Sequence, residues 1–207
     1  MTALQLEPLR EDDVDADPLR QFADWFAAAV QAGIPQPEAA ALATVDADGA
    51  PSLRMVLVKG VDERGFRFFT NYSSRKAREL AANPRAALTL YWGQLGRQVR
   101  VTGTIARVTR AESVQYARSR PRGSQLSALA SPQSTVIDAR ESLERRVGEL
   151  SERYADTAQL PVSDSWGGFR LTPQTIELWQ QRADRLHDRL LYTRSADGRW
   201  RLTRLAP

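Results

Sequence analysis

The sequence predicts a mainly β protein, a β-barrel with flanking helices, and three observations favour this class. Stretches of strand-forming residues follow one another from Ala40 to the C-terminus. Tight-turn sequences, such as Asp46-Ala47-Asp48-Gly49 and Ser195-Ala196-Asp197-Gly198, separate neighbouring stretches and indicate antiparallel pairing. A few helical patterns stand between the strands, which is typical of a barrel decorated by helices.

The first part of the chain is expected to hold an arm and one helix. Residues 1–16 are acidic, contain proline and lack periodicity, so we expect a mobile N-terminal arm before the folded domain of residues 17–207. Asp17-Pro18 has the pattern of an N-cap followed by proline in the first turn. The apolar residues that recur at helical spacing are Leu19, Phe22, Trp25, Phe26 and Val30. They predict an amphipathic helix that packs on the core and ends at Gly33.

The rest of the chain is expected to be mostly strands. The predicted strands cover residues 41–45, 51–59, 66–70, 86–92, 97–108, 169–171, 175–180, 189–194 and 199–205. The predicted helices cover residues 75–82, 111–119 and 138–154. Ser73 or Ser74 can cap the first of these helices, and Asn83-Pro84 ends it. Pro121 ends the second helix, and a proline turn is expected after it.

Composition narrows the classes of function. The 207 residues contain no cysteine and one histidine, so we expect no disulfide, no metal site and a cytosolic location. No apolar run approaches the roughly 20 residues that cross a bilayer. The net charge of +4 raises nucleic acid as a partner, but acidic residues interleave with the basic ones. We therefore expect no nucleic-acid and no membrane partner, and small anionic ligands fit the discrete basic clusters better.

One basic cluster lies in residues 176–189, which hold the single histidine. His187 stands between Arg185 and Arg189, with Trp179 upstream. These cations repel one another unless an anion lies among them, and arginine forks and aromatic planes suit a flat, negatively charged ligand. A solvated basic hairpin is the open alternative.

A second cluster surrounds the helix predicted at residues 75–82. Arg75 and Lys76 lie in its first turn, where positive charge opposes the helix dipole. A phosphate bound there would reverse this penalty, whereas the alternative is a solvated helix start. Arg54 and Lys59 bracket the preceding apolar strand; their odd spacing places them on opposite faces, so they share a ligand only across a bulge or at strand ends.

Further polar groups follow along the chain. Gln98 offers a donor and an acceptor on one strand face, although a surface strand explains it equally well. Tyr116 and Arg120 are neighbours on a short helix, and with Ser124 they form a plausible phosphate cradle. Neutral donors come from residues 131–134. No nucleophile elbow, Gly-x-Gly-x-x-Gly or P-loop pattern occurs, so the chain is suited to hold a cofactor that performs the chemistry.

These motifs together carry a family resemblance. They are RMVLVKG (54–60), FFTNYSSRKARELAANPRAAL (68–88), RQVRV (97–101), SRPRGSQL (119–126), ASPQS (130–134), WGGFR (166–170), IELWQQRADRLHDR (176–189) and the closing RLAP. In this order and spacing, the chain resembles the pyridoxine/pyridoxamine 5′-phosphate oxidase family. The resemblance implies a split β-barrel that forms a homodimer with FMN at the subunit interface. It implies oxidation of pyridoxamine or pyridoxine 5′-phosphate to pyridoxal 5′-phosphate, with O2 reoxidising the flavin and H2O2 released.

The resemblance also implies roles for individual residues. The implied FMN contacts are Arg54, Lys59, Phe69, Thr70, Arg75, Lys76, Gln98, Gln133, Ser134, Trp179 and Arg189. The implied substrate contacts are Lys59, Tyr116, Arg120, Ser124, Arg185 and His187, of which Arg185 and His187 meet the reacting ring.

The chain departs from the family pattern at three places. Phe69 stands where tyrosine is common, Ser127-Ala128-Leu129 replaces Gly-Ala-Trp, and residues 6–16 are short and acidic where many members have a basic lid. Two alternatives stay open for this reason: a related flavin oxidase of the phenazine-pathway type acting on another cyclic substrate, and a non-catalytic protein that binds flavin or pyridoxal phosphate.

Overall fold

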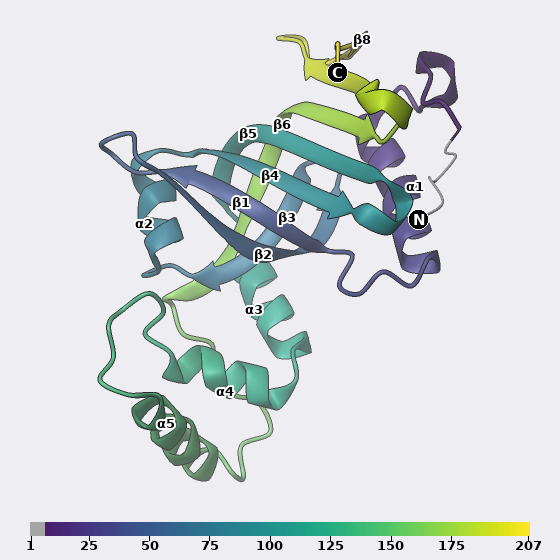
Figure 1. The fold of residues 1–207 in the computed structure, drawn as a ribbon. Helices are drawn as coiled ribbons and strands as arrows, with labels where there is room; N and C mark the ends of the chain where they lie inside the picture. The colour runs from purple at the N-terminus through teal and green to yellow at the C-terminus, as the bar shows by residue number, and fades with distance from the viewer. Residues whose placement is uncertain (1–6) are drawn as a thin grey trace.

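A closed antiparallel barrel forms the centre of the computed structural model, which describes residues 7–207 (Figure 1). Its strands are β1 (Ala39–Val45), β2 (Pro51–Asp62), β3 (Gly65–Asn71), β4 (Arg85–Trp92), β5 (Arg97–Arg107) and β6 (Trp166–Gln180). They pair in the order β3-β2-β1-β4-β5-β6, and pairing of β3 with β6 closes the cylinder. The hairpin of β7 (Asp188–Arg194) and β8 (Trp200–Arg204) continues the sheet from β6. The prediction of a β-barrel with flanking helices is confirmed.

Alternating side chains fill the barrel. Along β5, Val99, Val101, Gly103 and Ile105 are buried, whereas the residues between them are exposed. Phe66 and Phe68 of β3 are fully buried in the same core. Because successive side chains of a strand point to opposite faces, this period-two pattern removes one apolar set from water, which is the main favourable term in folding.

Strand β6 is longer than expected. Residues 169–171 and 175–180 were predicted as separate strands, but one strand of 15 residues runs through both. Pro173 has no backbone N–H to give to a ladder, and it lies where the β5–β6 register shifts between Thr102 and Gly103. A Cβ on Gly103 would lie 2.0 Å from the Thr172 carbonyl oxygen, so the bulge needs glycine there. The bulge thus accommodates the proline without ending the strand.

Helix α1 (Pro18–Gln31) packs on the barrel as predicted. The Asp17 carboxylate accepts a hydrogen bond from the Leu19 backbone N–H at 2.9 Å, and so caps the helix. Phe22 meets Phe66 of the core edge-to-face, with ring centroids 4.9 Å apart. Val30, expected on the buried stripe, is instead 54% exposed, whereas Ala29 beside it is fully buried.

Helix α2 (Arg75–Ala82) has the predicted bounds and lies across one side of the barrel (Figure 1). Ser74 occupies its N-cap position, but the Ser74 side chain makes no capping hydrogen bond. The expected side-chain cap is therefore absent from this helix, and its first backbone N–H groups remain without that partner.

Three helices project together from the barrel: α3 (Arg110–Ser119), α4 (Arg122–Ala130) and α5 (Arg140–Arg153) (Figure 1). Helix α4 was not predicted, since the sequence after Pro121 was interpreted as a turn. Pro121 instead stands at the N-cap position of α4, where a proline fits because its missing N–H is not needed. Residues 7–207 also form three short 3-10 helices: η1 (Glu11–Asp13), η2 (Gly93–Leu95) and η3 (Ala183–Arg185).

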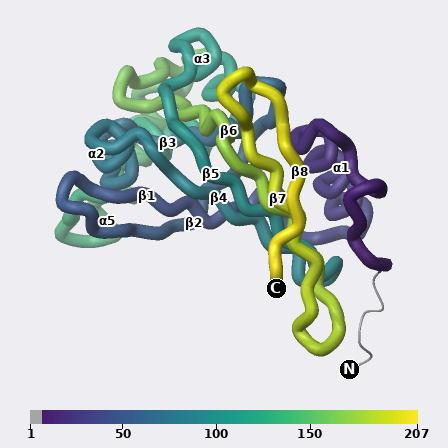
Figure 2. The backbone as a smooth tube through the Cα atoms, turned by 90° about the horizontal axis from the view of Figure 1, so that it is seen from above, coloured from purple at the N-terminus to yellow at the C-terminus, as the bar shows by residue number. Residues whose placement is uncertain are grey.

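The N-terminal segment, residues 7–16, runs beside β7 and β8 (Figure 2). The Leu9 backbone N–H donates to the Asp188 carboxylate at 3.1 Å, and Arg204 donates to the Leu9 carbonyl at 2.8 Å. Arg204 also binds Glu11, and this hydrogen bond lowers the Glu11 pKa to about 2. The expected mobile arm spans residues 1–16: residues 1–6 lie outside the described part, and residues 7–16 have these defined contacts.

Among residues 7–207, no helix combines the length and the apolar character needed to cross a membrane. The cytosolic location stays a prediction.

Candidate functional site

A cavity of about 550 Å³ opens between β2, β3, α2, α3 and α4. Chain segments that are far apart in sequence meet in its walls. The predicted site residues among its lining are Lys59, Phe69, Thr70, Lys76, Tyr116, Arg120, Ser124 and Gln133. The structure therefore brings together half of the residues singled out from sequence, including every implied contact to the substrate phosphate.

A small polar network forms one wall of this cavity. The Thr70 hydroxyl donates to Gln133 Oε1 at 2.8 Å, and Lys76 Nζ lies 3.2 Å from the Thr70 hydroxyl and 3.4 Å from Gln133 Oε1. Burial, and next the nearby charge of Arg54, lower the Lys76 pKa. Within residues 7–207, Lys76 has no ion-pair partner within reach, so this half-buried ammonium is suited to an anionic ligand.

Three aromatic rings form another wall. Phe69 of β3 stacks on Tyr116 of α3 with ring centroids 3.9 Å apart, and on Trp166 of β6 with centroids 5.7 Å apart. The Arg120 guanidinium carbon lies 5.1 Å from the centre of the Trp166 ring. Burial lowers the Arg120 pKa, and the stacked ring offsets part of that cost through a cation–π contact. This wall holds a cation and a phenol hydroxyl at fixed positions.

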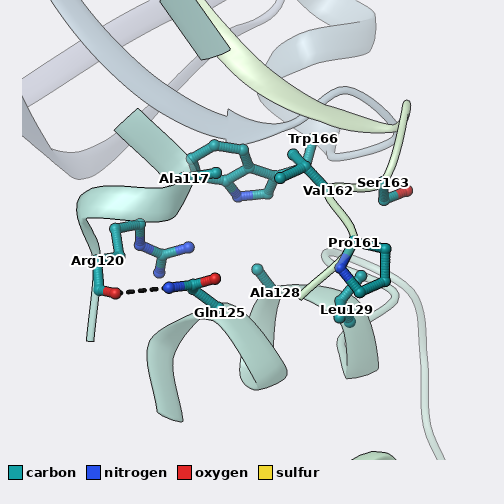
Figure 3. A pocket seen from close by; sticks show the side chains of 9 residues that line it. All are labelled: Ala117, Arg120, Gln125, Ala128, Leu129, Pro161, Val162, Ser163 and Trp166. Atoms are coloured by element: carbon teal, nitrogen blue, oxygen red, sulfur yellow. Dashed lines mark hydrogen bonds between the residues drawn. The ribbon is translucent and has the colours of Figure 1, made fainter. Parts of the chain in front are cut away.

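A smaller pocket of about 20 Å³, room for one water molecule, adjoins this wall (Figure 3). The Gln125 side-chain amide points toward Arg120 and donates to its backbone carbonyl at 2.7 Å. Ala128 and Leu129, two positions that depart from the family pattern, line the same pocket. The departures therefore lie directly beside the expected phosphate cradle.

Arg54 and Lys59 occupy different environments, as their odd spacing on β2 predicted. Lys59 lines the cavity and binds Glu38 at 2.7 Å, and this bond lowers the Glu38 pKa. Arg54 lies outside the cavity lining and binds Glu79 of α2 at 2.9 Å. Arg75, also outside the lining, reaches the same carboxylate with its Nε at 2.7 Å.

A second group of predicted residues lies at the β6–β7 turn. The Trp179 ring lies against the His187 imidazole with centroids 4.6 Å apart, and Gln98 is the β5 neighbour of Trp179. His187 Nδ1 accepts a hydrogen bond from the Arg182 backbone N–H at 3.2 Å. In the neutral imidazole the proton is then on Nε2, which makes Nε2 a donor. Arg185 is exposed and has a left-handed φ of 61°, a costly conformation for a residue other than glycine.

Arg189 completes this second group. Its Nε donates to Glu177 at 2.8 Å, and this bond raises the Arg189 pKa. Its Nη1 donates to the Ala206 carbonyl at 2.9 Å, so the C-terminus also holds this side chain. The guanidinium is therefore held in one orientation by two independent partners.

The two groups do not meet within one chain. Figure 1 places the β6–β7 turn away from α3, α4 and α5, and Figure 2 shows it away from α3 and α5 as well. None of Gln98, Trp179, Arg185, His187 and Arg189 lines the cavity. Ser134, next to Gln133, is exposed with a φ of 69° and also lies outside the lining. The roles expected for these residues stay predictions.

Two residues of this region were not singled out from sequence. The WGGFR motif does not mark Trp166 as a site residue, yet the Trp166 ring forms the base of the aromatic wall. The adjoining Gly167 is a signal in the sequence, because a glycine within a strand often marks a close approach of the backbone to another group. In the structure, a Cβ at Gly167 would lie 2.3 Å from the Tyr72 hydroxyl. Glu79 lies within a predicted helix, where a carboxylate is usually solvated, so its burial is not expected from the sequence.

Comparisons with known proteins find similarity over most of the chain. A family description, pyridoxamine 5′-phosphate oxidase, matches residues 26–154, and another, pyridoxine 5′-phosphate oxidase C-terminal dimerisation region, matches residues 166–207. The chain is 55% identical over 199 residues to the pyridoxine/pyridoxamine 5′-phosphate oxidase of Rubrobacter xylanophilus, covering 96% of this chain and 91% of that protein. It is 57% identical over 196 residues to the protein of that name from Paraburkholderia xenovorans, covering 94% and 91%.

Solved structures share the fold. PhzG from Burkholderia lata, in complex with tetrahydrophenazine-1-carboxylic acid, superposes with a TM-score of 0.90 at 33% identity, covering 98% of this chain and 99% of that one. A pyridoxamine 5′-phosphate oxidase-related, FMN-binding protein from Nostoc punctiforme superposes with a TM-score of 0.72 at 18% identity, covering 90% and 97%. The second is a likeness of fold alone.

Proposed function

Because this chain belongs to the pyridoxine/pyridoxamine 5′-phosphate oxidase family, we propose that it oxidises pyridoxamine or pyridoxine 5′-phosphate to pyridoxal 5′-phosphate. One observation carries the proposal: cationic and hydroxyl side chains from β2, α2, α3 and α4 converge on a single cavity. Such convergence of cations and hydroxyls suits ligands that bear phosphate esters.

FMN fits the α2 side of the cavity. Among residues 7–207, Lys76 has only neutral oxygen partners and no side chain caps α2, so an ammonium and free backbone N–H groups are available to a phosphate. Thr70 and Gln133 offer neutral donors and acceptors for the polar groups of the flavin. Bound FMN would supply hydride acceptance and reoxidation by O2, with release of H2O2.

The substrate phosphate fits the α3–α4 side. Arg120, Tyr116 and Ser124 line the cavity there, and Lys59 reaches it from β2. A guanidinium held over an indole keeps its fork free for the oxygens of a phosphate. In this arrangement Lys59 lies between two phosphorylated ligands, which is a stabilising place for a cation.

A second copy of the chain is part of the proposal. Leu53 and Met55 of β2 and Tyr91 of β4 are 68%, 64% and 60% exposed, an apolar surface that is costly in water. The C-terminal residues 166–207 match a dimerisation region. We propose that this surface is covered in a homodimer and that each cavity is completed by the partner's β6–β7 turn. FMN then lies at the subunit interface.

The completed site would act mainly by positioning. Arg185 presents a planar guanidinium that can stack on the pyridine ring of the substrate, which lysine cannot do. His187 carries a donor at Nε2 that can hold the reacting amine or hydroxyl in place. These two side chains would hold the exocyclic carbon of the substrate in the orientation from which bound FMN could accept a hydride, and such positioning is worth several kcal/mol.

Turnover of pyridoxamine 5′-phosphate tests this proposal. Purified protein should bind FMN and should form the aldehyde product aerobically, with one H2O2 for each aldehyde. The variant Arg185→Ala should keep FMN and lose most of kcat/KM. A protein that takes up no FMN, or one that binds FMN and forms no aldehyde, would contradict the proposal; the latter result fits the non-catalytic alternative.

The likeness to PhzG supports a second candidate, oxidation of a tricyclic substrate of the phenazine type. Identity to PhzG is 33%, against about 55% to relatives named for the vitamin phosphate. The phosphate cradle of Tyr116, Arg120 and Ser124 also has no use for a substrate without phosphate. Parallel assays with tetrahydrophenazine-1-carboxylic acid and pyridoxamine 5′-phosphate separate the two candidates.

A further inference from the structure

A buried carboxylate lies behind the cavity and joins three elements of the fold. Glu79 of α2 is 5% exposed. Its Oε2 accepts hydrogen bonds from Thr44 of β1 at 2.5 Å, from Ser52 of β2 at 2.6 Å and from Arg54 at 2.9 Å. Its Oε1 accepts from Arg75 Nε at 2.7 Å. Both oxygens are thus occupied, each in a different direction.

The two arginines that bind Glu79 differ in how many of their guanidinium donors are already used. Arg54 uses Nη1 on the Leu42 carbonyl and the Thr44 hydroxyl, and Nη2 on Ser52 and Glu79, so its fork is saturated inside the protein. Arg75 uses only Nε, and its side chain is 59% exposed. No residue from 7 to 207 accepts a hydrogen bond from the Arg75 Nη groups. Glu79 therefore fixes the stem of Arg75 and leaves its fork free.

The charges around Glu79 match a phosphate ester. Burial opposes ionisation of Glu79, but the four hydrogen bonds outweigh it and lower the pKa to about 2, so the group is anionic near neutral pH. Arg54, Arg75 and Lys76 with this carboxylate sum to two positive charges. A phosphate monoester carries about −1.5 to −2 near pH 7. The cluster can thus neutralise one such group without an excess of buried positive charge.

Helix stability does not explain the pair. Arg75 precedes Glu79 by four residues, and an acid placed before a base is the more favourable order in a helix. Arg75 also lies in the first turn, where the helix dipole disfavours a cation. An arrangement that helps the helix little is suited to a ligand at its N-terminus.

We infer that Glu79 is a positioning residue for cofactor phosphate: it aims Arg75 at the phosphate of FMN and so sets the preference for FMN over riboflavin. Arg54, which the family resemblance assigns to the FMN contacts, acts from behind by holding Glu79. The inference rests on the proposed binding of FMN at this end of the cavity.

Binding of two flavins tests the inference. Wild-type protein freed of flavin and the variant Glu79→Gln are titrated with FMN and with riboflavin, and quenching of flavin fluorescence gives each Kd. We expect Glu79→Gln to weaken FMN binding about tenfold or more and to leave riboflavin binding within about twofold, because only FMN carries the phosphate. Glu112→Gln is the matched control: Glu112 is also a carboxylate bound to arginines, but none of its arginine partners, Arg64, Arg67 and Arg170, is an expected FMN contact.

A double-mutant cycle adds a second readout. Arg75→Gln, a change at an exposed side chain, should remove the same preference, and Glu79→Gln should then add little to it. If Glu79→Gln does not fold, Glu79→Asp keeps the charge on a shorter stem and gives the same comparison. Equal weakening of both flavins, or an unchanged FMN preference, would overturn the inference alone. A wild-type protein with no affinity for FMN would overturn the proposed function as well.

Discussion

The pH dependence of folding stability should report the buried carboxylate directly. The Glu79 pKa is about 2 in the folded protein, against an ordinary value of 4.5. A lowered pKa means that the ionised group stabilises the fold above pH 4.5 and that this stability is lost as the pH falls toward 2. A tenfold change in the acid dissociation constant corresponds to about 1.4 kcal/mol. Ionised Glu79 therefore contributes about 3 kcal/mol to the free energy of unfolding near pH 7. At pH 3 about half of it should remain.

Urea unfolding of the wild type and of Glu79→Gln measures this contribution, because glutamine approximates the protonated acid. Both proteins are unfolded at pH 7 and pH 3, at one protein concentration and without flavin, and tryptophan fluorescence is followed. The difference in free energy of unfolding should be about 3 kcal/mol at pH 7 and should shrink at pH 3. A difference of equal size at both pH values would refute the reasoning, since Glu79 would then not titrate in this range.

Three more predictions concern other parts of the molecule. Gly167→Ala should lower the free energy of unfolding by about 1–3 kcal/mol in urea titrations, because the added Cβ would lie 2.3 Å from the Tyr72 hydroxyl; an unchanged midpoint would contradict this packing. Arg204→Ala should speed hydrogen exchange in the N-terminal segment, since the variant lacks the bonds to Glu11 and to the segment's backbone; unaltered exchange would show that other contacts hold it. Arg120→Lys should raise KM for pyridoxamine 5′-phosphate about tenfold and leave the Kd of FMN unchanged, because lysine lacks the planar fork; a shift of the FMN constant instead would move this residue to the cofactor side.

Most strands of the barrel could be predicted because the residues of each strand show which of its faces is buried. Period-two alternation and Gly-containing turns mark each strand locally, and β1 to β5 follow the expected ranges within a few residues. The misses arise where distant residues decide. Pro173 argues for a strand end until the β6 bulge opposite Gly103 of β5 is known, and Pro121 ends one helix while it starts the next.

The site was predictable in its parts and less so in its assembly. Motif order identified Lys76, Arg120 and Gln133, and the structure places all three around one cavity. The sequence could not indicate that Arg54 turns away from that cavity, because strand periodicity gives a face but not a partner. It also could not show that the β6–β7 turn lies far from the cavity of its own chain, since strand and turn patterns are local and give no distance between elements.

The contacts of Asp188 tie both ends of the polypeptide to one point. Its carboxylate receives the Leu9 backbone N–H from the start of the chain and Arg204 Nη1 from its last residues, and it directly follows His187. A change that displaces Leu9 or Arg204 would therefore act on the carboxylate that directly follows His187 in the chain.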